Sequence, residues 1–300
     1  MYCLPECYPC LENLARRCAS LATADLQKRG EAVEAALAYL EQGFSLECVS
    51  TGLAAEMQRI IRLKTGNEDP FAAVKKKEIA LARNFVEKTA PAARSSLQEL
   101  VRFAAKGNGF DFFQDLTLLE KELHEPVELA RDETAALGEL LQSFRLGGGK
   151  KIIYLADNAG EALFDLPLVH HLAQAAPVYY AVKGSPVQND LALVDLVESG
   201  LIASFPNVIS TGTDSPGLDL TGAAPPFKSL LAEADLILAK GMGHYETLPE
   251  LALPQPVFLI FQAKCNPIAQ DSALPRSGYA AYFLRSRPDH RLNTDFQGHS

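Results

Sequence analysis

The chain has 300 residues, of which 48% are hydrophobic and 22% are charged, and its formal net charge is -9. This composition is typical of a globular protein with one large domain or two of unequal size. The negative net charge argues against a nucleic-acid partner. No apolar stretch is long enough for a transmembrane helix, and residues 1–10 lack the pattern of a secretory signal, so we expect a cytoplasmic protein.

Residues 1–146 are expected to form an all-helical domain. From Leu11 to about Phe144 the sequence is rich in Ala, Leu, Glu and Arg and has no convincing alternating run, and apolar residues recur at helical spacing between Leu53 and Leu63. Thr89-Ala90-Pro91 resembles a helix boundary. Three consecutive glycines at 147–149 then mark the end of this domain, because glycine is unfavourable inside a helix.

Residues 147–300 are expected to form a three-layer α/β/α, Rossmann-like domain with a mostly parallel sheet. Short runs rich in β-branched and aromatic residues alternate there with segments of helical length, which favours βαβ units. The runs are residues 151–156, 178–182, 204–210, 236–239, 257–261 and 279–284. Since ligands bind beyond the carboxyl ends of the strands in such sheets, the residues that follow each run are the candidates for a site.

Asp157 and Asn158 directly follow the first of these runs. Carboxylate and amide oxygens are ligands that suit Mg²⁺, Mn²⁺ or another hard divalent ion. Gly160 would let the backbone approach a ligand, and the helix expected after it would direct N–H groups at an anion. The alternative is that Asp157 or Asn158 only caps that helix.

A second pair of this kind, Asn189-Asp190, follows the next run. Taken alone, Asp190 is a candidate helix cap before Leu191. Two such pairs at adjacent strand ends instead favour a shared cation, because two buried acids without one would be costly.

Lys240 ends another apolar run and leads into a loop with Gly241 and Gly243. A lysine in this position can hold a phosphate group as a point charge, with backbone N–H groups assisting. The alternative is a solvated lysine in a flexible loop.

Several motifs together resemble the damage-control phosphatase family, formerly called domain of unknown function 89, whose eukaryotic members include the acidic residue methyltransferase 1-like proteins. The motifs are Asp157-Asn158-Ala159-Gly160-Glu161 with Phe164-Asp165 downstream, Pro186 followed by Asn189-Asp190, residues 240–246, and Lys264-Cys265 with Pro267-Ile268-Ala269. Residues 5–11, 69–71 and 106–108, together with Asp111, are similar to the prokaryotic branch, which carries an N-terminal Cys-x-x-Cys pair. The resemblance covers nearly the whole chain.

This resemblance implies a metal-dependent phosphatase, a hydrolase that removes phosphate from a small phosphorylated metabolite such as a sugar phosphate or a damaged phosphometabolite. The cofactor would be Mn²⁺ (manganese), Co²⁺ (cobalt), Ni²⁺ (nickel) or Mg²⁺, which would activate a water molecule. The metal ligands would be Asp157, Asn158 and Asp190. The catalytic residues would be Asp157, Glu161 and Lys240, and the substrate-binding residues Asn108, Gly160, Glu161, Asn189, Lys240, Gly241 and His244.

His244 departs from the family pattern, which usually has asparagine at this position. Histidine also donates a hydrogen bond but is bulkier and titratable, so a different substrate choice or pH response is expected.

Two other functions are compatible with such a chain. A Rossmann-like sheet can serve a carboxyl methyltransferase that uses S-adenosylmethionine, but the chain has no Gly-x-Gly-x-x-Gly loop after its first expected strand. A non-catalytic metabolite-binding or metal-binding protein would use the same pocket, and turnover of a phosphorylated substrate distinguishes it from an enzyme.

Six cysteines are present, and four of them lie in the first 18 residues. Cys7-x-x-Cys10 together with Cys265 could hold zinc or iron, with Cys3 as a fourth ligand, or take part in redox exchange. The alternative is that these thiols pack the helical domain against the sheet. We expect no stoichiometric zinc in the purified protein.

Overall fold

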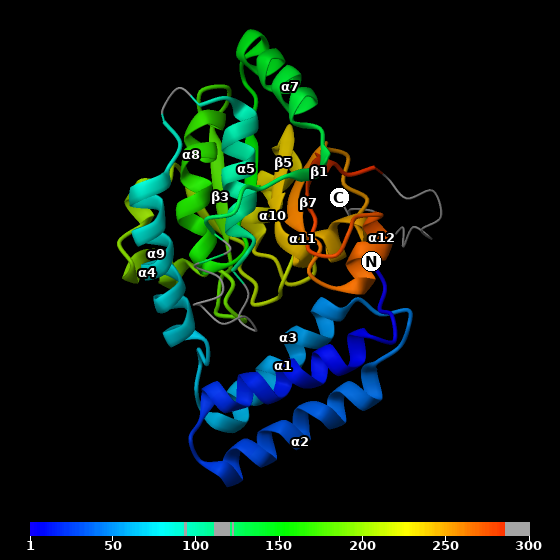
Figure 1. Ribbon diagram of the computed structural model, residues 1–300. Coiled ribbons are helices and arrows are strands. Elements are labelled where there is room, and N and C mark those ends of the chain that lie inside the picture. The colour runs from blue at the N-terminus through cyan, green and yellow to red at the C-terminus, as the bar shows by residue number, and fades with distance from the viewer. Residues whose placement is uncertain (93–94, 111–120, 122, 286–300) are drawn as a thin grey trace.

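The computed structural model describes residues 1–92, 95–110, 121 and 123–285 (Figure 1). Its helices are α1 (Cys7–Ala22), α2 (Leu26–Gly43), α3 (Ser50–Thr65), α4 (Ala72–Thr89), α5 (Leu97–Gly107), α7 (Thr134–Gly147), α8 (Ala162–Leu172), α9 (Leu193–Glu198), α10 (Pro225–Glu233), α11 (Gly241–Thr247) and α12 (Asn266–Ser272). Its strands are β1 (Leu129–Asp132), β2 (Ile152–Leu155), β3 (Val178–Val182), β4 (Val208–Ser210), β5 (Leu236–Lys240), β6 (Val257–Gln262) and β7 (Tyr279–Phe283), and short 3-10 turns are η1 (Ala159–Glu161), η2 (Ile202–Ser204) and η3 (Leu248–Glu250).

These strands form one sheet in the order β1-β7-β6-β5-β2-β3-β4. Every neighbouring pair is parallel except β6 and β7, which are antiparallel. The central strands β2 and β5 are buried along their whole length, as expected for a sheet covered on both faces. The mostly parallel sheet predicted from the sequence is therefore confirmed.

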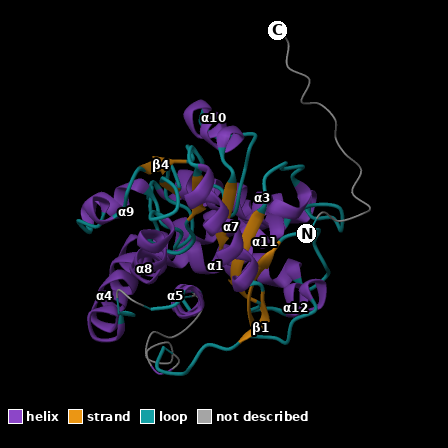
Figure 2. Ribbon diagram, turned by 90° about the horizontal axis from the view of Figure 1, so that it is seen from above, coloured by secondary structure: helices purple, strands orange, loops and turns teal. Residues whose placement is uncertain are grey.

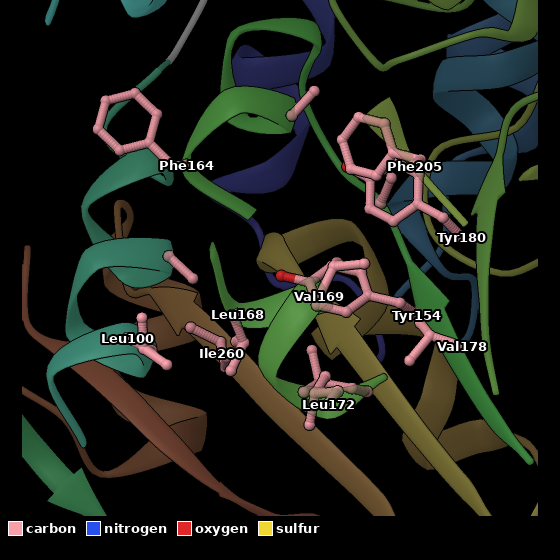
Figure 3. Packing of buried hydrophobic residues seen from close by; sticks show 14 of the residues in the cluster. Leu100, Tyr154, Phe164, Leu168, Val169, Leu172, Val178, Tyr180, Phe205 and Ile260 are labelled. Carbon is pink, nitrogen blue, oxygen red and sulfur yellow. The ribbon is translucent and has the colours of Figure 1, made fainter. Parts of the chain in front are cut away.

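Helices cover both faces of the sheet and give the predicted three-layer α/β/α arrangement (Figures 1 and 2). Neighbouring residues of a strand point to opposite faces, so Tyr154 joins the hydrophobic cluster that includes α5 and α8, whereas Leu155 joins the cluster that includes α10, α11 and α12. Figure 3 shows part of the first cluster, in which Leu168 of α8 lies near Ile260 of β6. Burial of these apolar side chains provides the main stabilisation of the domain.

Helices α1, α2 and α3 pack around a hydrophobic cluster of their own, which includes Leu14, Ala36 and Met57. Figure 1 shows this three-helix unit, in blue, below the sheet-containing part. Asp25 caps the start of helix α2, where its carboxylate accepts hydrogen bonds from two backbone N–H groups of the first turn, and Gly66 caps the end of α3 with a φ of 71°. Helix α3 contacts α11, which follows the carboxyl end of β5.

The structure differs from the sequence expectations at two strands. Strand β1 (Leu129–Asp132) was missed; it pairs with β7, and its four residues are too few for a clear alternating pattern. The strand expected over 204–210 begins only at Val208, because Ile202–Ser204 forms the turn η2. Asp111 of the family motifs lies outside the described residues.

The helices of residues 1–146 divide between two hydrophobic clusters. Helices α4, α5 and α7 contribute Ile79, Val101 and Leu137 to the cluster on one face of the sheet, while α1 to α3 have a separate core. The domain boundary after residue 146 remains a prediction. Within the described ranges, no helix is long and apolar enough to cross a membrane.

Candidate functional site

Backbone contacts join the segments that leave β2 and β3. These strands are parallel neighbours, so their carboxyl ends meet at the same edge of the sheet. Asn158 and Asp190 form an isolated β-bridge, and the N–H of Leu191 donates to the carbonyl oxygen of Asp157 at 2.7 Å. The three residues predicted as metal ligands are thus placed side by side. We call Asp157, Asn158 and Asp190 the oxygen cluster.

The carboxyl group of Asp157 lies in a strongly charged environment. Burial raises its pKa well above the usual range, and the negative charges of Glu161 and Asp190 raise it further. Lys264 and Lys183 oppose this shift but do not cancel it. A cation between these groups would favour the ionised carboxylate.

Gly241 makes room for the Asp157 carboxylate. A Cβ atom added at Gly241 would lie 1.7 Å from Asp157 Oδ2, and the φ of this residue is +82°. Both facts require glycine, because another side chain would clash and would be strained at this φ. Gly241 was predicted to bind substrate; the structure places it directly beside a candidate metal ligand.

Asp190 has a buried carboxylate oxygen that the protein does not satisfy. The side chain is 3% exposed, and its Oδ2 lies 3.5 Å from Nζ of Lys183. Among the described residues this oxygen has no hydrogen-bond partner. Burial raises the pKa of Asp190 to about 6, although Lys183 and Lys75 lower it. Since a buried polar atom without a partner is costly, this oxygen is suited to bind a cation.

The amide of Asn158 is held in one orientation. Its Nδ2 donates to Glu161 Oε1 at 2.8 Å and to the carbonyl oxygen of Phe110 at 3.2 Å. The nitrogen is therefore committed to the protein, and the amide oxygen is the atom that a cation would use. The oxygen cluster has two carboxylates and one amide oxygen, a donor set that fits a hard divalent ion.

A second set of polar side chains lies next to the oxygen cluster. Lys240 is fully buried, and its Nζ lies 2.7 Å from Glu161 Oε2 and 2.8 Å from Asp165 Oδ1. The hydroxyl groups of Tyr154 and Tyr180 donate to Asp165 at 2.7 and 2.9 Å. We call Lys240, Glu161, Asp165, Tyr154 and Tyr180 the lysine network.

The charges of the lysine network compensate one another. Burial lowers the pKa of Lys240, but the carboxylates of Asp165 and Glu161 outweigh this effect and raise it above its ordinary value. Burial raises the pKa of Asp165, and the charge of Lys240 opposes the shift. Lys240 was predicted to bind a phosphate group; in the structure its ammonium group contacts two carboxylates.

Glu161 accepts hydrogen bonds at both carboxylate oxygens. Its Oε1 accepts from Asn158 at 2.8 Å, and its Oε2 accepts from Nδ2 of Asn108 and from Lys240. A carboxylate that is occupied in this way is better suited to positioning its neighbours than to removing a proton. Asn108 is 1% exposed, and its Oδ1 has no hydrogen-bond partner among the described residues.

Asn189 and Gly160, predicted to bind substrate, contact other parts of the protein. The amide nitrogen of Asn189 donates to Glu78 Oε1 at 2.9 Å, which connects the loop after β3 to α4. A Cβ atom added at Gly160 would lie 2.6 Å from the ring of Phe110. Glycine at this position is therefore required by close packing.

His244 is buried in α11, which directly follows Lys240. Its Nδ1 lies 2.6 Å from the carbonyl oxygen of Lys240. Burial lowers the pKa of His244 to about 3, and the charge of Lys183 contributes to the shift. The imidazole is therefore neutral near pH 7, and this residue is not expected to produce a pH response there.

Asp165 and Lys264 lie in motifs of the family resemblance but had no predicted role, and Tyr154, Tyr180 and Lys183 were not predicted as site residues. Asp165 follows Glu161 at the four-residue spacing that places two side chains on one face of a helix. Tyr154 and Tyr180 occupy equivalent positions on neighbouring strands, since they are partners in the β2–β3 register. Buried tyrosines in otherwise apolar strands indicate a buried polar partner. Lys264 donates to the carbonyl oxygen of Phe110 at 2.8 Å.

The cysteines predicted as metal ligands differ in exposure and in their contacts. Within the described ranges, no group of three or more His, Cys, Asp or Glu residues could hold a metal ion. The oxygen cluster is not a group of this kind, because one of its three residues is Asn158. Cys10 is exposed, while Cys7 is partly buried and accepts from the N–H of Leu4 at 3.4 Å. The expectation of no stoichiometric zinc remains a prediction.

Comparisons with known proteins agree on one family. A family model described as damage-control phosphatase ARMT1-like domain matches residues 3–277. Damage-control phosphatase PH1575 of Pyrococcus horikoshii is 29% identical over 274 residues, which cover 90% of this chain and 94% of that protein. A damage-control phosphatase of Archaeoglobus fulgidus is 28% identical over 272 residues, covering 89% of this chain and 94% of that protein. The crystal structure of PH1575, described as a DUF89 family protein, superimposes with a TM-score of 0.82 at 28% identity and covers 95% of this chain and 100% of that one.

Proposed function

The chain belongs to the damage-control phosphatase ARMT1-like family, and from this premise we propose that it hydrolyses a small phosphorylated metabolite with the help of a divalent metal ion. The observation that carries the metal dependence is the oxygen cluster, in which backbone pairing brings three residues with oxygen-bearing side chains together and Oδ2 of Asp190 has no hydrogen-bond partner among the described residues. The names of the relatives favour phosphatase activity over the methyltransferase alternative.

In this proposal Asp157, Asn158 and Asp190 hold the metal ion. A bound divalent ion would neutralise charge on the phosphoryl group and supply a more acidic water molecule. Gly241 leaves the space that the Asp157 carboxylate needs, and Glu161 fixes the amide of Asn158 so that its oxygen is directed to the ion.

Lys240 supplies positive charge close to the reaction. An ammonium group has three donors, and the carboxylates of Glu161 and Asp165 account for two of them. The third donor is available in this proposal to a phosphoryl oxygen, where charge stabilisation dominates the chemistry. The two carboxylates hold Lys240 in place, and the proposed role of Asp165 is to position it.

The substrate is proposed to be a small phosphate monoester, such as a sugar phosphate or another damaged phosphometabolite, and the site of action the cytoplasm. Asn108 is a candidate to contact it, since this buried residue carries an amide oxygen without a partner among the described residues. A substrate hydroxyl group would satisfy that oxygen.

A screen of phosphate release tests the proposal. Protein treated with a chelator is incubated with a panel of phosphorylated metabolites, alone and with Mn²⁺, Co²⁺, Ni²⁺ or Mg²⁺. We expect release only with a metal, and a metal-binding isotherm of about one ion per chain that the Asp190→Asn variant loses. Full activity after chelation, or transfer of a methyl group from S-adenosylmethionine without phosphate release, would overturn the proposal.

A further inference from the structure

The segment before α1 is fixed beside the connection between α2 and α3. The N–H of Cys3 donates to the carbonyl oxygen of Cys48 at 2.8 Å, although the two residues are far apart in the sequence. The same contact brings their side chains together, with Sγ of Cys48 at 3.5 Å from Sγ of Cys3. All six cysteines of the chain are thiols in this structure.

A third thiol completes this group. Cys7 is the first residue of α1, its thiol interacts electrostatically with that of Cys3, and its Sγ accepts from the N–H of Leu4 at 3.4 Å. Cys3 is 2% exposed, whereas Cys7 and Cys48 are partly exposed. We call Cys3, Cys7 and Cys48 the thiol cluster. Its buried member lies between two members that solvent can reach.

Interactions within the thiol cluster make its three members unequal. The interactions with Cys3 and with the N–H of Leu4 lower the pKa of Cys7, which increases its thiolate fraction at neutral pH. The interaction with Cys7, together with burial, raises the pKa of Cys3 well above its usual range. Cys7 is therefore the nucleophile and also the best leaving group of the three.

We propose that the thiol cluster is a thiol–disulfide exchange site, at which a low-molecular-weight disulfide such as oxidised glutathione converts Cys3 and Cys48 to a disulfide. The Cys7 thiolate attacks one sulfur of the small disulfide, forms a mixed disulfide and releases a small thiolate. The Cys3 thiol passes its proton to that thiolate, and its sulfur attacks Cys7 Sγ and expels the second small thiolate.

In the last step the Cys48 thiol passes its proton to the second small thiolate, and its sulfur attacks Cys3 Sγ at the observed contact. The bond between Cys3 and Cys7 breaks, and Cys7 leaves as a thiolate. In total two protein thiols are oxidised, and one small disulfide is reduced to two small thiols. The disulfide stays between Cys3 and Cys48 because Cys7 is the better leaving group. It ties the N-terminal segment to the connection before α3.

Peptide mapping of the full-length protein tests this site. The reduced protein is incubated with oxidised glutathione at neutral pH, and samples taken over time are digested without reduction and analysed by mass spectrometry. We expect a Cys3–Cys48 linked peptide as the main product and a rise in melting temperature on the order of 5 °C, since the crosslink restricts the unfolded chain. A Cys7–Cys10 disulfide as the main product would overturn the proposal.

Matched serine variants test the order of the steps. Cys7→Ser should slow formation of the Cys3–Cys48 bond on the order of tenfold, because the thiol that starts the exchange is lost. Cys10→Ser is the control and should leave the rate unchanged, while Cys48→Ser should stop oxidation at a species that contains Cys7. An unchanged rate in Cys7→Ser, with the melting temperature of the reduced variant equal to that of the parent, would show that Cys7 does not start the exchange. Phosphatase activity plays no part in these measurements.

Discussion

The oxygen cluster and the lysine network lie next to each other but differ in how their charges are balanced. In the lysine network, one ammonium group lies between two carboxylates, and two tyrosine hydroxyl groups satisfy Asp165 further. In the oxygen cluster, the nearest cation to Asp190 is Lys183 at 3.5 Å, and Oδ2 of Asp190 has no hydrogen-bond partner among the described residues. The charges of the lysine network are balanced without a ligand, whereas the oxygen cluster is expected to need one.

The largest expected effect follows from replacing an oxygen-cluster carboxylate. Asp190→Asn should reduce metal-dependent turnover by roughly a thousandfold or more, because a charged ligand is lost. The metal-free variant should unfold at the same or a higher temperature than the parent, since a buried carboxylate with a raised pKa is removed. Steady-state kinetics and thermal melts measure both.

Asp235→Asn is the matched control for this variant. Asp235 lies at the amino end of β5 and pairs with Lys150, so its replacement should leave turnover near the parent value. A loss of the same size in both variants would show that Asp190 has no special role, and near-normal turnover in Asp190→Asn would remove it from the metal site.

Replacing Lys240 should reduce stability strongly, in contrast to the replacement of Asp190. Lys240→Met leaves two buried carboxylates without their cation, which should cost about 3 to 5 kcal/mol of unfolding free energy. Turnover should fall by roughly 30-fold to a thousandfold, while metal affinity should stay the same or rise because a nearby positive charge is lost. Denaturant unfolding and calorimetric metal titration measure the two effects.

A double variant tests whether charge balance is the cause. Adding Asp165→Asn to Lys240→Met removes one of the two unpaired carboxylates and should restore part of the lost stability. If the double variant is as unstable as the sum of the two single variants, the carboxylates do not depend on Lys240.

The pH dependence of stability should also separate the two regions. The folded-state pKa of Asp190 is raised from its ordinary 3.8 to about 6, so the folded protein binds this proton more tightly than the unfolded chain does. The stabilisation that this proton gives to the folded protein is fully present below pH 3.8 and is lost as the pH rises through about 6. The loss in the free energy of unfolding is at most about 3 kcal/mol. Unfolding of metal-free protein at several pH values should show this loss. Saturating metal should remove this pH-dependent loss of stability. An identical pH profile of stability with and without metal would contradict the idea that the oxygen cluster binds the metal.

The smallest effect is expected at His244. Because burial lowers its pKa to about 3, the ring is neutral at all pH values near neutrality. His244→Asn should therefore leave the pH profile of kcat/KM unchanged between about pH 5 and 8 and change its value by no more than about threefold. A shift of the profile would show that the ring is charged in the working enzyme.

The closeness of the oxygen cluster could be predicted from the sequence because it depends on sheet topology alone. Asp157 and Asn158 follow β2, Asp190 lies in the loop after β3, and parallel neighbours end at the same edge of a sheet. The role of these residues as metal ligands remains a prediction, as do the roles assigned to Glu161 and Lys240.

The hydrogen-bond and ion-pair partners of individual side chains could not be predicted from the sequence pattern. Lys240 was expected to face a phosphate group, but Asp165 on α8 reaches its ammonium group, a contact that depends on how α8 packs on the sheet. In the same way, Asn189 contacts Glu78 of α4, a helix distant in the sequence. Strand β1 was missed because its pairing with β7, rather than its own pattern, makes it a strand.

The backbone bridge between Asn158 and Asp190 has a consequence for the dynamics of the fold. It lies at the ends of β2 and β3, which pair inside the sheet, while α1, α2 and α3 have a separate core. A ligand stabilises the cooperative unit that it bridges and leaves independently opening units almost unchanged. Metal binding should therefore slow amide hydrogen exchange in β2 and β3 and have little effect on exchange in α2. The chain would then consist of one metal-responsive folding unit and one unit that opens regardless of the metal.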